Sequence, residues 1–188
     1  MPAPVRILAF SGSARRESLN RKFLGFAVEA ARLAGCEVTL DDLGGLAMPL
    51  YNGDLEDAEG IPQGAKKLAE LVASHDGLLV ASPEYNAKPT PLLMNAIDWC
   101  SRVEPVPFEG KVAAVISASP GPFGGVRSLA LTQQLLSKLG CLVVPGQCYL
   151  AGAAKAFDAA GGLTQEHARR SVTALVSKLA WTASRLAP

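Results

Sequence analysis

The sequence predicts a doubly wound α/β sandwich, in which a parallel sheet of five strands lies between two layers of helices. Short apolar runs alternate with longer amphipathic stretches along the 188 residues, and this alternation is typical of βαβ units. The first, third and fourth runs are nearly continuous in Leu, Val, Ile and Ala, as expected of strands that helices cover on both faces. No repeat, low-complexity tract or linker interrupts the pattern, so we expect a single domain over residues 1–188.

The expected strands are the apolar runs at residues 7–10, 37–40, 77–81, 112–117 and 142–144. Helical spacing of apolar residues predicts five helices between and after them, over residues 19–33, 63–74, 92–100, 126–139 and 164–186. Sheets of this class bind ligands outside the carboxyl ends of their strands. The loops that follow the strands are therefore the place to look for a site.

Composition excludes several classes of function. The net charge of +1 gives no electrostatic reason to bind nucleic acid. No apolar run approaches the roughly 20 residues of a membrane span, and no basic segment with a long apolar run opens the chain, so we expect a cytoplasmic protein. The four cysteines form no Cys-x-x-Cys pair and have no metal-ligand spacing to a histidine. We expect them to be reduced and mostly buried, with no metal site.

The loop after the first strand, residues 11–20, reads SGSARRESLN and has the character of an anion site. The first backbone N–H groups of a helix have no internal partner, and the helix dipole favours negative charge there. Ser18 can cap the helix, while hydroxyls at Ser11 and Ser13, the amide of Asn20 and the guanidinium of Arg15 suit a terminal phosphate. The alternative is an ordinary turn with solvated arginines.

Motifs that would give this loop another chemistry are absent. Neither Gly-x-x-x-x-Gly-Lys-Ser/Thr nor Gly-x-Gly-x-x-Gly occurs after the first strand, which argues against a nucleoside-triphosphate loop and a Rossmann dinucleotide turn. The loop holds no cysteine that could act as the nucleophile of a phosphatase. We therefore expect it to hold a phosphate without cleaving it.

The loop after the third strand reads Ser82-Pro83-Glu84-Tyr85-Asn86. Pro83 ends the strand, and the N–H groups that follow can form a nest that points at a ligand. The alternative is a polar turn in which Tyr85 only packs. The rim offers Glu84 and no histidine, and we interpret His75 and His167 as surface residues. A site with a phosphate grip and no catalytic side chain indicates that a cofactor carries the chemistry.

The helix over residues 92–100 is apolar on more than one side. Leu93, Ile97 and Cys100 make one stripe, and a second stripe consists of Leu92, Ala96 and Trp99. One stripe can cover the sheet, and an exposed second stripe would mark an interface. We therefore expect a homodimer with this helix at its seam. The alternative is a helix buried under a loop of the same chain.

Two stretches give the sequence a family likeness. Residues 12–20 resemble the phosphate loop of NADPH-dependent FMN reductases, a group that includes chromate- and quinone-reducing flavoproteins. Residues 82–86, together with Asn95-Ala96-Ile97-Asp98-Trp99, are similar to the second signature of the same family. The resemblance implies a flavodoxin-like fold with a five-stranded parallel sheet of order 2-1-3-4-5, one FMN per subunit, NADPH or NADH as co-substrate, and dimers or tetramers.

The resemblance also implies a set of FMN-binding residues. The phosphate would be held by the first loop, the isoalloxazine would be lined largely by backbone of the second, and two residues would approach the flavin from the end of the fourth strand. In that order they are Ser13, Arg15, Ser18, Leu19 and Asn20; Pro83, Glu84, Tyr85 and Asn86; and Ser117 and Gly121. The chain departs from the family where a Ser-Ile-Pro-Gly type turn is usual. It reads Ala87-Lys88-Pro89-Thr90-Pro91 there, and Met94 stands where lysine is common.

The activity that the resemblance implies is an FMN-dependent NAD(P)H oxidoreductase. It would reduce quinones, flavins or similar acceptors, chromate and azo compounds among them, by ping-pong hydride transfer through the flavin, with no catalytic side chain. A flavodoxin-type electron carrier and a non-catalytic FMN-binding protein are the alternatives. Electron carriers of that type are usually strongly acidic, unlike this chain of net charge +1.

Overall fold

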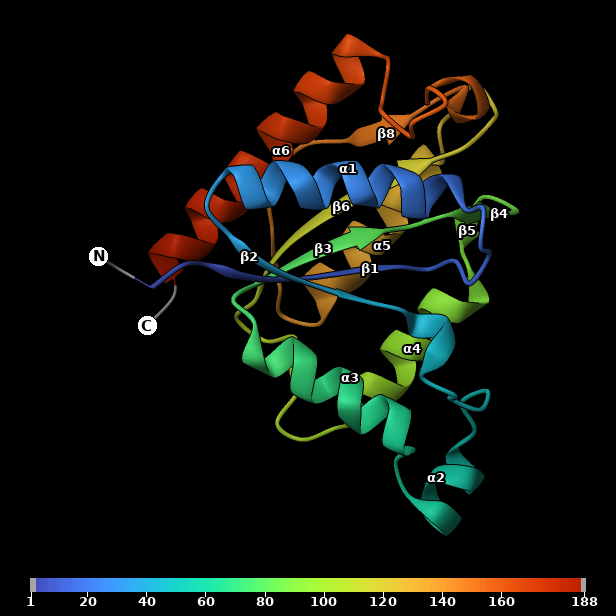
Figure 1. Cartoon of the computed structure of the whole chain (residues 1–188). Helices are drawn as coiled ribbons and strands as arrows, with labels where there is room; N and C mark the ends of the chain where they lie inside the picture. The colour runs from blue at the N-terminus through green and yellow to red at the C-terminus, as the bar shows by residue number, and fades with distance from the viewer. Residues whose placement is uncertain (1–2, 187–188) are drawn as a thin grey trace.

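The computed structural model describes residues 3–186, and a parallel sheet runs through the middle of the molecule (Figure 1). Its strands are β1 (Arg6–Ser11), β2 (Glu37–Asp41), β3 (Gly77–Ala81), β6 (Val112–Ala118), β7 (Leu142–Val143) and β8 (Cys148–Leu150). The order is β2-β1-β3-β6-β7, with β8 also paired to β6, and every pairing in this sheet is parallel. The predicted order 2-1-3-4-5 is confirmed.

The fifth strand position is shared by two short strands. β7 pairs with the start of β6 through Val112 and Ala113, and β8 pairs with its end through residues 116–118. Pro145 and Gly146 separate the two. Proline has no N–H to donate to a ladder, and Gly146 has a positive φ of 140°. The chain therefore leaves the sheet after β7, beside the start of β6, and pairs with the end of β6 again at β8.

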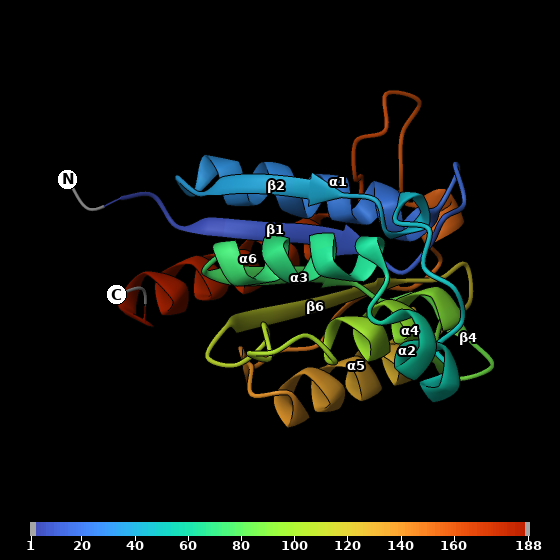
Figure 2. The same cartoon turned by 90° about the horizontal axis from the view of Figure 1, so that it is seen from below.

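Helices cover both faces of the sheet (Figure 1, Figure 2). One face carries α1 (Leu19–Leu33) and α6 (Glu166–Leu186), and the other carries α3 (Gln63–Ser74), α4 (Pro91–Cys100) and α5 (Val126–Lys138). Side chains alternate along β1, so that Ile7 and Ala9 pack under α1 and α6, while Leu8 and Phe10 pack on the opposite face. The five predicted helices are confirmed.

The sequence did not predict the smaller elements. They are the short helix α2 (Gly53–Glu59), two 3₁₀ turns, η1 (Leu43–Gly45) and η2 (Ala153–Lys155), and a hairpin of β4 (Glu84–Tyr85) and β5 (Lys88–Pro89). Of these, the hairpin matters most for function, because it follows β3 directly at the carboxyl edge of the sheet.

The second apolar stripe of α4 is covered by the chain itself. Trp99 is fully buried, and its indole Nε1 donates to the carbonyl of Pro49 at 2.8 Å. The ring of Tyr51 meets that of Trp99 edge-on, with centroids 5.0 Å apart. Asn95 of α4 also binds this segment, because its Oδ1 accepts from the Tyr51 N–H at 2.8 Å. The expectation that this stripe is exposed is therefore wrong, and the alternative of a helix buried under a loop of the same chain is confirmed.

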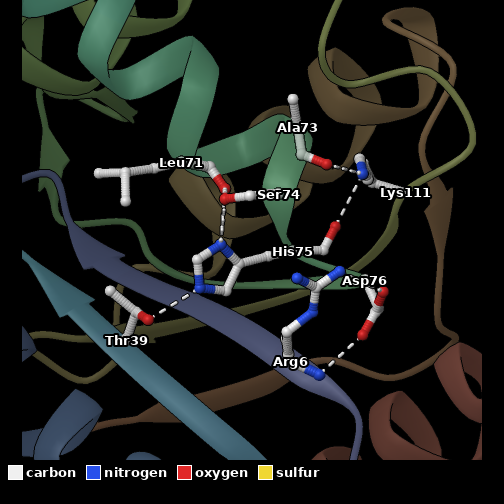
Figure 3. Close-up of polar contacts among 8 residues, drawn as sticks. All are labelled: Arg6, Thr39, Leu71, Ala73, Ser74, His75, Asp76 and Lys111. Atoms are coloured by element: carbon white, nitrogen blue, oxygen red, sulfur yellow. Dashed lines mark hydrogen bonds and ion pairs between the residues drawn. The ribbon is translucent and has the colours of Figure 1, made fainter. Parts of the chain in front are cut away.

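His75 lies at the C-terminal end of α3 and is buried, so its prediction as a surface residue is wrong. Figure 3 shows its ring between two partners. Nδ1 lies 2.6 Å from the carbonyl oxygen of Leu71, and Nε2 lies 2.8 Å from Oγ1 of Thr39 on β2. Because a carbonyl only accepts, Nδ1 is the donor in the contact with Leu71. His167, on α6, is exposed as predicted.

Lys111 closes the same end of α3 from the start of β6 (Figure 3). Its Nζ donates to the carbonyl oxygens of Ala73 and His75, both at 2.7 Å. These are among the carbonyls that a helix end leaves without internal partners. Burial lowers the pKa of the Lys111 amine. This cluster joins β2, α3 and β6 at the amino end of the sheet, opposite the candidate site.

The cysteines are free and buried, as predicted. They are Cys36, Cys100, Cys141 and Cys148. Burial raises the pKa of the last three to about 12, so these thiols are not nucleophiles near neutral pH. Within residues 3–186 we find no cluster of three or more acidic, histidine or cysteine side chains able to hold a metal ion, and no helix long and apolar enough to cross a membrane.

Candidate functional site

Residues 12–18 connect β1 to α1. We name them the phosphate loop after the family motif that they resemble. Ser18 caps α1 as predicted, because its Oγ accepts from the N–H of Arg21 at 3.3 Å, and its own N–H donates to the carbonyl of Arg15 at 3.2 Å. Oγ of Ser13 accepts from the N–H of Arg15 at 3.4 Å. The loop thus folds back over the head of α1, where the helix dipole favours an anion.

Gly12 lets this loop leave the sheet under the start of α4. Its N–H continues the β1–β3 ladder by donating to Ala81 at 2.9 Å. A Cβ at this position would lie 2.8 Å from Cβ of Leu93 and 2.9 Å from Oγ1 of Thr90. Only glycine fits without moving one of these elements, so the approach of α4 fixes where the loop begins.

Asn20 ties the head of α1 to the end of β6. Its Nδ2 donates to the carbonyl of Ala118 at 2.7 Å, and its Oδ1 accepts from the Ala118 N–H at 2.9 Å. The amide that the sequence assigned to a phosphate is thus largely engaged with backbone, leaving one N–H of Nδ2. The structure gives Asn20 the role of joining two walls of the site.

Most of the predicted site residues line one pocket at the carboxyl edge of the sheet. The first loop, the hairpin and the loop after β6 all contribute to its wall, which consists of Ser13, Arg15, Ser18, Leu19, Asn20, Pro83, Glu84, Tyr85, Ala118, Ser119 and Pro120. The sequence missed the last three. It directed attention to the loop after the fourth strand but selected Ser117 and Gly121, which lie on either side of the residues that face the pocket.

Three predicted residues do not line the pocket. Ser117 is fully buried behind it, where a Cβ at Gly125 would collide with its Oγ. Gly121 lies beyond the pocket wall, and its carbonyl accepts from Gly152 at 3.1 Å. Asn86 is exposed at the tip of the hairpin. The Oγ atoms of Ser117 and Ser11 have no hydrogen-bond partner in the described part of the chain. Ser11 lines another cavity, between α1 and the end of β2.

The loop predicted as a nest of amides is a hairpin with a two-residue turn. Glu84 pairs with Pro89 and Tyr85 with Lys88, so the turn consists of Asn86 and Ala87. Both have positive φ, 51° and 63°, as the preferred two-residue hairpin turns require. Asparagine tolerates this conformation better than alanine, for which it costs roughly 1–2 kcal/mol. The departure from the family pattern thus begins inside this turn.

Glu84 acts as the cap of α5. That helix begins after Gly125, which has no capping side chain, and Oε2 of Glu84 accepts from the N–H groups of Arg127 and Ser128 at 3.1 and 3.2 Å. Oε1 accepts from the Arg127 guanidinium, 2.7 Å from Nη2. Burial by itself would raise the pKa of this carboxyl, but the bonds from Arg127 and Ser128 outweigh it and lower the pKa. Glu84 therefore stays ionised and offers no proton to a ligand.

The residues fit a flavin nucleotide bound by its phosphate. Arg15 is exposed at the pocket and forms no ion pair with any of residues 3–186. The cavity volume of about 100 Å³ is below the roughly 300–1,000 Å³ of sites that enclose a whole small ligand. A cavity of this size can hold an anion as large as a phosphate, and Tyr85 beside it is 50% exposed.

A parallel sheet of this order, with helices on both faces and a pocket at the head of its first helix, defines a flavodoxin-like protein. The sequence profile of NADPH-dependent FMN reductases matches residues 5–156, and the chain belongs to that family. It is accordingly an FMN-dependent NAD(P)H oxidoreductase, as predicted.

Individual relatives agree with this assignment. NAD(P)H-dependent FMN reductase PA1204 of Pseudomonas aeruginosa is 37% identical over 174 residues, which cover 92% of this chain and 91% of the relative. The quinone reductase of Escherichia coli K12 is 31% identical over 153 residues, 81% of this chain and 80% of the relative. Among solved structures, the flavoenzyme NAD(P)H:(acceptor) oxidoreductase FerB from Paracoccus denitrificans superposes with a TM-score of 0.82 at 27% identity, covering 96% and 98% of the two chains.

Proposed function

We propose that this protein is a quinone reductase that holds FMN by its phosphate in the pocket at the head of α1. The observation that carries the proposal is the convergence of three loops on one pocket whose only acidic side chain, Glu84, is committed to capping α5. When bound, FMN supplies the redox chemistry, accepting hydride from NAD(P)H and reducing the acceptor. The protein contributes position and hydrogen bonds.

We assign the phosphate to Ser13, Arg15 and Ser18, supported by the N–H groups at the start of α1. Hydrogen bonds to charged groups contribute about 1.5–3 kcal/mol each, and micromolar binding needs about 8 kcal/mol. Two or three such bonds, together with partial burial of the ring, are sufficient. We assign the ring to the outer wall made by Pro83 and Tyr85, where Glu84 contributes backbone groups because its carboxylate faces α5.

A flat, small acceptor suits this arrangement. A ring that lies outside a small cavity leaves one face open, so that NAD(P)H and the acceptor can use it in turn. Relatives named quinone reductases cover most of this chain, among them 2-hydroxy-1,4-benzoquinone reductase of a Burkholderia species, 30% identical over 187 residues. We therefore propose quinones as acceptors, with free flavins, chromate and azo compounds as further candidates.

The test is an anaerobic spectrum. Purified protein is mixed with FMN and then NADPH or NADH, and a quinone is added afterwards. The reductase must bleach the visible flavin absorbance with the nicotinamide, faster than free FMN does, and recover it with the quinone. A bound flavin that nicotinamide does not bleach would favour the electron carrier or the non-catalytic FMN-binding protein. Release of phosphate without any bound colour would indicate a hydrolase.

We further propose one domain over residues 1–188, a cytoplasmic location and a homodimer or homotetramer. The buried free cysteines suit a reducing compartment. Exposed apolar side chains at Leu33, Phe123 and Trp181 offer surface for self-association, whereas the second stripe of α4 is already covered. Sedimentation of dilute protein tests the oligomer, and a stable monomer would contradict it.

A further inference from the structure

Thr90 lies between the start of α4 and the phosphate loop. It is 2% exposed and is the N-cap of α4, because its Oγ1 accepts from the Leu93 N–H at 3.4 Å. The same hydroxyl donates its own proton to the carbonyl oxygen of Gly12 at 2.5 Å. One side chain thus connects the amino end of α4 to the first peptide of the phosphate loop, across 78 positions of sequence.

This contact fixes the direction of the next N–H group. The carbonyl of Gly12 and the N–H of Ser13 belong to one planar trans peptide and point in opposite directions. Because Thr90 holds the carbonyl on the α4 side, the Ser13 N–H points away from α4. Ser13 lines the pocket, and none of the hydrogen bonds among residues 3–186 uses its N–H. That donor is therefore free among the described residues.

We propose that Thr90 is a positioning residue for the phosphate of the bound flavin, acting through the Gly12–Ser13 peptide. The inference rests on the proposed function, since the anion is the FMN phosphate. Leu93, Thr90, Gly12 and Ser13 form one chain of donors and acceptors that begins at the positive end of α4. Bonds in such a chain polarise one another, so a second helix adds to the field that α1 already supplies.

The surrounding packing gives the contact little freedom. A Cβ on Gly12 would lie 2.9 Å from Oγ1 of Thr90 and 3.1 Å from Cδ of Pro83. Thr90 also lies within the Ala87–Pro91 stretch where the chain departs from the family pattern. The departure therefore places a hydroxyl where it can reach the phosphate loop.

The experiment compares Thr90→Ala, which removes the hydroxyl without adding bulk, with Thr90→Ser, which keeps it and serves as the matched control. The affinities of each protein for FMN and for riboflavin are measured by quenching of flavin fluorescence, and thermal unfolding without flavin reports any loss of the α4 cap. We expect Thr90→Ala to weaken FMN binding about tenfold and riboflavin binding less than about twofold. The difference is the effect expected when one hydrogen bond to a charged group is misaligned. Thr90→Ser should retain the preference for FMN.

The ratio of the two affinities decides the proposal. A purely structural cap would lower stability, or both affinities equally, and leave the ratio unchanged; that result would overturn the role of Thr90. If Thr90→Ala does not fold, ¹⁵N spectra of the wild-type protein titrated with FMN and with riboflavin replace it. The Ser13 amide must shift with FMN and not with riboflavin, and equal responses overturn the proposal.

Failure of the proposed function gives a different result. If the wild-type protein binds neither flavin, the reductase assignment fails, and titration with inorganic phosphate then decides on Thr90. A Ser13 amide that shifts with phosphate in wild type and Thr90→Ser, and less in Thr90→Ala, supports the positioning role. An amide that does not respond, or responds equally in all three, rejects it.

Discussion

Arg15 is exposed at the pocket and forms no ion pair with a carboxylate among residues 3–186. Arg21, on the first turn of α1, pairs with Asp42 at 3.2 Å. The two arginines belong to the same short stretch of sequence, and the sequence does not distinguish their partners. The structure does, because β2 brings Asp42 alongside α1. Arg15 is therefore the arginine that we propose for the phosphate.

The change Arg15→Ala should therefore weaken FMN binding by roughly ten- to a hundredfold, the value of one charge-assisted bond. Riboflavin, which lacks the phosphate, should bind as before, so the preference for FMN should largely disappear. Fluorescence titration of both flavins measures this, with Arg16→Ala as the matched control one residue away. Unchanged discrimination in Arg15→Ala would refute the role given to this residue.

At the scale of elements, the site is built by contacts between the start of α1, the end of β6, the hairpin and the start of α5. Glu84 makes the last of these contacts and substitutes for a missing cap on α5. Its ionised form is the one that the structure stabilises, since the net effect of its partners lowers the pKa of the carboxyl. Its contribution to folding is present above the unfolded-state pKa, near the ordinary value of 4.5, and is lost as the pH falls through the lowered value.

The change Glu84→Gln should remove the contribution of this carboxylate to the pH dependence of folding stability. We expect the variant to be less stable than wild type at neutral pH by about 1–2 kcal/mol, the usual effect of losing a charged helix cap. The difference should shrink as the pH falls below about 4.5, where Glu84 is protonated in the unfolded state and then in the folded state. Denaturant unfolding across this range tests it, and a difference that does not change with pH would contradict the ionised cap.

Gly12, at the junction of β1 and α1, and Gly25, inside α1, provide a matched pair of substitutions. Gly12→Ala should destabilise the fold by about 1–3 kcal/mol, the usual cost of forcing extra atoms into a packed site, because its Cβ would lie 2.8 Å from that of Leu93. Gly25→Ala, inside α1, meets nothing within 4 Å and should stabilise by about 0.5–1 kcal/mol. Unfolding of both variants by denaturant gives the comparison. A Gly12→Ala protein as stable as wild type would show that α4 does not constrain the loop.

At the scale of the whole molecule, the sequence predicted what depends on local pattern. Continuous apolar runs gave β3 and β6, helical spacing gave the five large helices, and Ser18 was correctly identified as the cap of α1. The family likeness supplied the strand order. The loops that meet at the pocket followed from the rule that sheets of this class bind ligands at the carboxyl ends of their strands. Periodicity alone could not have placed β2 beside β1, because strand order depends on long-range packing.

The contacts that the sequence missed join residues far apart in the chain. Asn20 and Ala118 are 98 positions apart, and no local pattern shows that the amide bonds backbone there. Trp99 was placed on an exposed stripe because residues 46–52 carry no sign that they fold back over α4. His75 was placed on the surface because its partner on β2, Thr39, is 36 positions away. In each case tertiary contact, and not residue type, decides the environment.

The central claim is that FMN binds by its phosphate at the head of α1, and a crystal structure of the protein with FMN tests it most directly. The phosphate should lie within hydrogen-bond distance of the Ser13 N–H and of the Arg15 guanidinium, with the ring against the hairpin at Tyr85. A flavin whose phosphate points into solvent, or one bound elsewhere while this pocket holds only water, would contradict the account.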